Sequence, residues 1–169
     1  MGGTSGLTDG APYYPIVGDF DLSGGADIFW YRPGSDSDHL WLSSCNSPDA
    51  TRISFSINGN YKPFTGDFDG DGSADIFWYS PGSGSDTLYL GGSSGGSTPF
   101  TTVSSVNVSG DYSPVVGDFD GDGDSDILWY QPWATSSAQW TSNGDGTFSS
   151  AQVTNPPYEG FPVGYGTAY

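Results

Sequence analysis

Basic residues are almost missing from this sequence. It has three Lys and Arg residues against twenty Asp and Glu residues, which gives a formal net charge of −17. Such a charge repels DNA, RNA and anionic membrane surfaces, so nucleic acid is excluded as an electrostatic partner and metal cations are favoured. Cysteine is scarce too. Cys45 is alone, which excludes an intrachain disulfide.

The sequence also lacks long apolar runs and helical periodicity. Runs such as Ile28-Phe29-Trp30-Tyr31 are far too short for a transmembrane helix, so membrane insertion is excluded. No sustained 3.6-residue period indicates a helix bundle or a coiled coil, and no secretory signal is visible at the N-terminus. Glycine is abundant, with 27 residues, and aromatics make up 16% of the 169 residues. This composition predicts a small domain with many turns and an aromatic core.

A block of sequence recurs three times, at intervals of about fifty residues. It begins with a Pro-x-x-Gly-Asp-Phe-Asp segment and continues into an Asp-Ile-Phe-Trp-Tyr segment, with Leu in place of Phe in the third copy. The glycines of the first segment are Gly18, Gly66 and Gly117, and the second segments span 27–31, 75–79 and 126–130. A repeat of this length indicates a propeller or a repeat array.

Four short strands are predicted in each repeat, separated by clusters of Gly, Ser, Asn and Asp. The two shared segments form the first two strands, and the second strand is apolar enough to be buried on both faces. The third strands lie at 40–42, 88–90 and 138–140, and the fourth at 51–57, 100–108 and 147–153. The predicted fold is therefore all-β, with three four-stranded propeller-type blades and partial terminal strands, as a partial or oligomer-completed β-propeller.

The chain divides into five predicted segments. They are a strand or linker at 1–13, repeats at 14–60, 61–110 and 111–157, and an incomplete fourth repeat or exchanged terminal strand at 158–169. Three blades are too few for a closed ring, since propellers usually have four to eight. Two explanations stay open: copies associate through their terminal strands into a homo-oligomer or polymer, or the chain is an excerpt of a longer array.

More than half of the acidic residues lie in three loops between the first two predicted strands, at 19–27, 67–75 and 118–126. Carboxylates so concentrated repel one another unless a cation binds, and calcium accepts six to eight hard oxygen ligands. Side chains at positions 1, 3, 5 and 9, with the carbonyl at 7, can surround one ion. An EF-hand is excluded because position 12 is Trp instead of Glu and a strand follows. Zinc and magnesium are disfavoured, and a solvated acidic turn is the alternative.

The run Gly-Asp-Phe-Asp-Gly-Asp-Gly-x-x-Asp-Ile, preceded by Pro-x-x, resembles the FG-GAP/VCBS repeats, which are integrin-alpha-like propeller repeats, over about residues 14–157. The resemblance implies one calcium ion per repeat, a secreted or cell-surface setting, and a role in adhesion, sugar binding or support of a secreted hydrolase. The ligands that it implies are Asp19, Asp21, Ser23, the Gly25 carbonyl and Asp27; Asp67, Asp69, Asp71, the Ser73 carbonyl and Asp75; and Asp118, Asp120, Asp122, the Asp124 carbonyl and Asp126. The first site is expected to be the weakest, because Ser23 replaces a carboxylate and Leu22 replaces a glycine.

We expect no enzymatic activity, because His39 is the only histidine and paired carboxylates occur only inside the acidic loops. The expected function is that of a calcium-binding repeat protein with a structural, adhesive or self-assembling role. The alternative is a lectin-type module whose partner is a glycan or a cell-surface protein. Candidate ligand-binding aromatics are Trp41, Tyr89, Trp133 and Trp140, and packing between blades is the competing explanation for such residues.

Overall fold

A computed structural model describes residues 12–34, 37–44, 47–92, 98–100 and 102–156. Within these ranges the regular structure consists of strands alone, so the all-β prediction is confirmed. The described residues contain no helix that is long and apolar enough to cross a membrane. Of the predicted terminal segments, 1–13 is described only at residues 12 and 13, and 158–169 lies outside the described residues.

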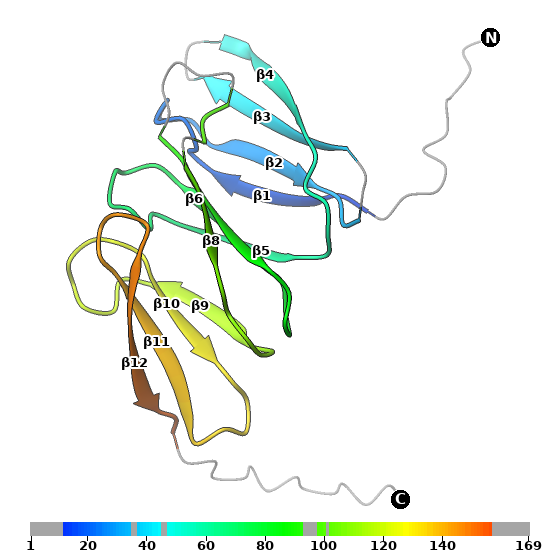
Figure 1. The fold of residues 1–169 in the computed structure, drawn as a ribbon. Helices are drawn as coiled ribbons and strands as arrows, with labels where there is room; N and C mark the ends of the chain where they lie inside the picture. Colours follow the sequence, from blue (N-terminus) through cyan, green and yellow to red (C-terminus); the bar gives the residue numbers. More distant parts are fainter. Residues whose placement is uncertain (1–11, 35–36, 45–46, 93–97, 101, 157–169) are drawn as a thin grey trace, which may run out of the picture.

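Three four-stranded antiparallel sheets follow one another along the chain, and in each of them the strands pair in chain order (Figure 1). The first sheet contains β1 (Tyr14–Gly18), β2 (Asp27–Tyr31), β3 (Asp38–Ser44) and β4 (Ser47–Phe55). The second contains β5 (Lys62–Gly66), β6 (Asp75–Tyr79), β7 (Asp86–Leu90) and β8 (Thr102–Val106). The third contains β9 (Ser113–Gly117), β10 (Asp126–Tyr130), β11 (Ser136–Ser142) and β12 (Phe148–Thr154). These are the predicted blades, and they form an open row instead of a closed ring.

Each sheet has two different faces, which are fixed by the register of its second strand. Ile16 stands opposite Phe29, so these two side chains lie on the same face of the sheet. Side chains alternate along a strand, so Tyr31, two residues after Phe29, lies on this face too. Trp30 points to the other face. We call the two surfaces the tyrosine face, marked by Tyr31, Tyr79 or Tyr130, and the tryptophan face, marked by Trp30, Trp78 or Trp129.

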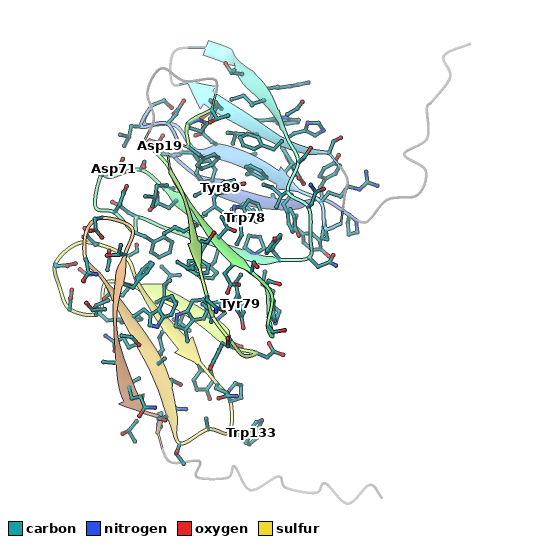
Figure 2. All side chains as sticks on the ribbon, viewed as in Figure 1. Asp19, Asp71, Trp78, Tyr79, Tyr89 and Trp133 are labelled. Carbon is teal, nitrogen blue, oxygen red and sulfur yellow. The ribbon has the colours of Figure 1, made fainter. Side chains whose placement is uncertain are left out.

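The hydrophobic core lies between the sheets. The indole of Trp78 is 5.3 Å from the ring of Phe29 and 5.1 Å from that of Tyr31, so it packs on the tyrosine face of the first sheet (Figure 2). Trp129 repeats this packing on the second sheet, with Tyr79 at 5.1 Å. Two buried clusters result, one at each junction between sheets. Packing between blades therefore explains Trp78 and Trp129.

Buried tyrosine hydroxyls fasten each sheet to the segment that leads to the next. The hydroxyl of Tyr31 donates to the carbonyl of Gly59 at 2.8 Å and accepts from the amide of Tyr61 at 2.9 Å. Tyr79 makes the same two bonds, with Gly110 and Tyr112. Both hydrogen-bonding functions of each hydroxyl are satisfied, so the ring can be buried without an unpaired polar group.

The second strands do not all share the burial that the sequence predicts. All five residues of β6 are buried. In β2 buried and half-buried positions alternate, and in β10 Leu128 is half-buried and Tyr130 exposed. The prediction of burial on both faces is therefore right for β6 and wrong for the other two. The reason is that, among the described residues, the middle sheet has a neighbouring sheet on both faces and each outer sheet has one on a single face.

Candidate metal centres

Each acidic loop joins the first two strands of a sheet and is shaped by residues with positive φ. In the second loop Gly70 and Gly72 have φ values of 71° and 91°, which L-residues with side chains rarely adopt. The first loop makes the same turn with Leu22 at φ 58°. Because the left-handed conformation costs a residue with a Cβ roughly 1–2 kcal/mol, the first loop is strained where the others are not.

The loops bring carboxylates together as three compact triads. Within each triad one oxygen from every residue lies within 4.8 Å of the others. The triads are Asp19, Asp21 and Asp27; Asp67, Asp69 and Asp71; and Asp118, Asp120 and Asp122. Positions 1, 3 and 5 thus converge in the second and third loops. In the first loop, which has Ser23 at position 5, the carboxylate of position 9 completes the triad.

Backbone amides of the loops hold these carboxylates in place. Oδ2 of Asp67 accepts from the amide of Gly72 at 2.9 Å, and Oδ1 of Asp71 accepts from the amide of Ser73 at 2.8 Å. Asp19 accepts in the same way from Ser23 and Gly24, at 3.0 and 2.8 Å. The triads are therefore ordered by the loops themselves, which lowers the entropic cost of binding an ion.

The aspartate at position 9 joins each loop to the end of the third strand. Asp75 is buried, and its Oδ2 accepts from the amide of Phe68 at 2.6 Å while Oδ1 accepts from Gly91 at 2.8 Å. Asp27 and Asp126 make equivalent pairs of bonds. Of these three aspartates, the structure places Asp27 alone within a triad.

The second loop combines burial with concentrated negative charge. Burial, reinforced by the neighbouring Asp71 carboxylate, raises the pKa of Asp69, and burial raises the pKa of Asp75 to about 7. Oδ1 of Asp67 and Oδ1 of Asp69 are both buried and have no hydrogen-bond partner among the described residues. Buried anionic oxygens are costly unless something compensates their charge, so this donor set fits a hard divalent ion.

The few basic side chains with a described partner are engaged elsewhere. Lys62 forms an exposed ion pair with Asp111 at 3.3 Å, and the guanidinium of Arg52 lies 4.7 Å from the ring centre of Trp41. Neither of them neutralises an acidic loop.

Comparisons with known proteins agree with this geometry. The model for an FG-GAP-like repeat matches residues 67–129, and the model for an FG-GAP repeat matches residues 110–149. Residues 67–149 therefore belong to the FG-GAP repeats. The comparisons with curated proteins and with solved structures gave no match. The family matches cover the second and third acidic loops, and the first sheet repeats the same strand order and register.

Neighbouring repeats are linked through their acidic loops. The amide of Ser125 donates to the carbonyl of Asp67 at 2.6 Å, and its hydroxyl accepts from the amide of Asp67 at 3.0 Å. The amide of Ala74 likewise donates to the carbonyl of Asp19 at 2.8 Å. The three loops therefore lie on one side of the molecule, the side on which Asp19 and Asp71 are labelled (Figure 2).

The candidate sugar-binding aromatics do not form one site. Trp41, Tyr89 and Trp140 occupy the same position in three different repeats, each edge-on to the tryptophan of its second strand. Trp133 lies apart from Tyr89, in the loop between β10 and β11, where it is 78% exposed with φ 69° (Figure 2). It stands where the other repeats have Gly34 and Gly82 in a similar backbone conformation.

Sequence reasoning missed a second buried aspartate at the start of the third strand. Asp38 accepts from the amides of Arg32 and Ile57 at 2.7 and 2.6 Å. Asp86 makes the equivalent bonds at 2.6 and 2.7 Å. The sequence contains a sign of this role, because Asp38 and Asp86 follow the position-9 aspartates of their repeats at the same spacing. The third repeat has Ser137 at this position.

Proposed function

We propose that this chain is a non-enzymatic calcium-binding repeat protein, secreted or on the cell surface, with a structural or adhesive role. The observation that carries the proposal is the pair of buried, unpartnered carboxylate oxygens of Asp67 and Asp69 inside a triad. The match to FG-GAP repeats, which are typical of calcium-binding extracellular proteins, supports both the ion and the location.

The proposed ligands follow from the triads. Asp67, Asp69 and Asp71 hold the ion of the second repeat, and the corresponding residues of the other triads hold the other two. Backbone carbonyls at position 7 complete the shell, as the family pattern implies. The first site is the weakest of the three, because Ser23 brings no charge and Leu22 strains its loop.

The ion supplies charge neutralisation and cross-linking, and no bond is made or broken. An ion that binds only the folded loops stabilises the fold by about 1.4 kcal/mol for each tenfold excess over its dissociation constant. Each loop is also bonded to the neighbouring sheet, so the ions stabilise the junctions as well as the turns.

Calorimetric titration with calcium and thermal unfolding in calcium and in chelator test the proposal. We expect about three bound ions and a higher melting temperature in calcium. Asp69→Asn should lose one ion and part of the calcium-dependent stabilisation, while in chelator it should be no less stable than the parent, because a buried charge has been removed. Asp111→Asn is the matched control, since it removes an exposed carboxylate outside the loops.

Two results would contradict the proposal. One is a titration without binding heat together with equal melting temperatures in calcium and chelator. The other is an equal loss of calcium-dependent stability in Asp69→Asn and Asp111→Asn, which would indicate a general effect of negative charge.

Glycan binding is a second candidate function, and one cleft favours it. A cavity of about 260 Å³ opens between the first two sheets. Its lining is Ser56, Ile57, Asn58, Tyr61, Trp78, Thr87 and Tyr89. Aromatic surfaces beside hydroxyl and amide groups suit a sugar. A glycan array with calcium-loaded protein tests this, with Asn58→Ala expected to reduce binding and Asn107→Ala, outside the cleft, expected to leave it unchanged. An array without hits would remove this candidate.

A further inference from the structure

The two internal junctions of the chain follow one pattern, in which the tyrosine face of one sheet meets the tryptophan face of the next. At the first junction the two sheets approach so closely that a methyl carbon placed on Gly18 would lie 2.5 Å from Cβ of Ala74. At the second junction the corresponding distance is 2.8 Å, from Gly66 to Cβ of Ser125. Backbone hydrogen bonds accompany both contacts.

The tyrosine face of the third sheet carries apolar side chains at the equivalent positions, but no described residue covers it. Val115, Phe119 and Tyr130 are 47%, 44% and 37% exposed. In the first sheet the equivalent side chains, Ile16, Phe20 and Tyr31, are buried under the second sheet. A carbon placed on Gly117 meets only the Phe119 ring, at 3.4 Å, among the described atoms. Within the described part of the chain, this face is a junction surface without a neighbouring sheet.

The tryptophan face of the first sheet is the complementary surface, and no sheet formed by described residues covers it. Trp30 packs edge-on against Trp41, as Trp78 packs against Tyr89, but it is only half-buried. Val17 is 54% exposed. Ala26, which is also exposed, occupies the position that Ala74 takes against Gly18 in the first junction.

We propose that the tyrosine face of the third sheet binds the tryptophan face of the first sheet in a second copy of this chain. The contact would repeat the internal junctions, with Ala26 of one copy against Gly117 of the other and Trp30 against Tyr130. Because the two surfaces differ, the association is head to tail and continues into a ring or a fibre. The apolar side chains that now face solvent would be covered.

This inference extends the structural role proposed above and names its partner, but it rests on apolar faces and not on the metal sites. The charge of −17 per chain opposes association at low ionic strength. Bound calcium and salt both reduce that repulsion. The association is therefore expected to be strongest in calcium at physiological salt.

Two substitutions block one face each without disturbing the single chain. Ala26→Leu adds bulk to the tryptophan face, and Gly117→Val adds bulk to the tyrosine face, at sites that are open within one copy. Light scattering in calcium should give a multiple of 17.7 kDa for the parent and 17.7 kDa for each variant alone. An equimolar mixture should form a dimer and nothing larger, because it combines one intact tyrosine face with one intact tryptophan face. Thermal unfolding of both variants confirms that they fold.

Several outcomes would overturn the inference. One is a parent that stays monomeric over a wide range of concentration. Another is a mixture of the two variants that stays monomeric while the parent associates. A third outcome has two parts: both variants associate as the parent does, and deletion of residues 158–169 abolishes association. This result would show that the terminal segment, and not the two sheet faces, forms the contact between copies. Calcium titration of the same samples separates these outcomes from failure of the metal sites.

Discussion

Gly66 gives the sharpest test of how the sheets pack. It ends β5, its φ is not positive, and alanine can adopt its backbone conformation. The added methyl group would lie 2.7 Å from Cζ of Phe68 and 2.8 Å from Cβ of Ser125. Phe68 is fully buried between the second and third sheets and cannot rotate away. Gly66→Ala must therefore push the two sheets apart.

The magnitude follows from two opposing effects. Overpacking a well-filled core costs about 1–3 kcal/mol. Replacing glycine by alanine in an allowed conformation stabilises by about 0.4–1 kcal/mol, because it restricts the unfolded chain. Gly66→Ala should thus destabilise by about 1–2 kcal/mol. Gly117→Ala meets only the exposed Phe119 ring, at 3.4 Å, so it should be neutral or slightly stabilising.

Urea unfolding of the two variants and the parent measures this difference. Samples are kept in calcium at low protein concentration, so that one chain is compared with one chain. The midpoint for Gly66→Ala should fall and that for Gly117→Ala should not, with equal slopes. Equal changes in the two variants would refute the reasoning, because the two glycines differ in the presence of a following sheet.

Three further predictions concern the loops and the buried aspartates. Asp86→Ala leaves two backbone amides without an acceptor, so it should lower the free energy of unfolding by about 2–5 kcal/mol in urea titrations. Ser137→Ala, at the equivalent position of the third repeat, should lower it by about 1 kcal/mol. Equal losses in the two variants would contradict this prediction. Leu22→Gly should raise stability by about 1 kcal/mol in the same assay, since it relieves a positive φ, and a loss would show that the leucine side chain matters more. Because the pKa of Asp75 is raised in the folded state, the folded chain keeps a proton on this carboxylate at pH values where the unfolded chain has lost it. In chelator, the free energy of unfolding should therefore fall as pH rises from about 4 to 7, and calcium should reduce this fall. A free energy of unfolding that does not change with pH in chelator would contradict the prediction.

The strands and the acidic loops could be predicted because each repeat carries its own local signals. The apolar Asp-Ile-Phe-Trp-Tyr segment, preceded by a loop of Gly and Asp, specifies a strand and a turn whatever surrounds it. Three copies of the pattern in register make the agreement among them informative. The structure accordingly places β2, β6 and β10 on those segments.

Exposure of the outer faces could not be predicted in the same way. Trp30, Trp78 and Trp129 lie in nearly identical local sequences, yet Trp30 is half-buried and the other two are buried. The difference depends on whether another sheet packs against the tryptophan, and a local sequence pattern carries no information about that. The role of Asp86 was missed for a related reason, since an aspartate among serines indicates a solvated turn until the register places it inside.

The acidic loops and the sheet junctions depend on each other, because the same residues belong to both. Ser125 pairs with the backbone of Asp67 through two hydrogen bonds, so the geometry of the second triad is fixed partly by the third sheet. The carboxylate of Asp124 also reaches the second loop, where a carbon placed on Gly70 would lie 2.5 Å from its Oδ1. The loop at 118–126 has no such support from a following sheet within the described chain. A neighbouring copy bound to the tyrosine face would therefore order this loop more than the other two. The calcium affinity of the third triad would change with that order.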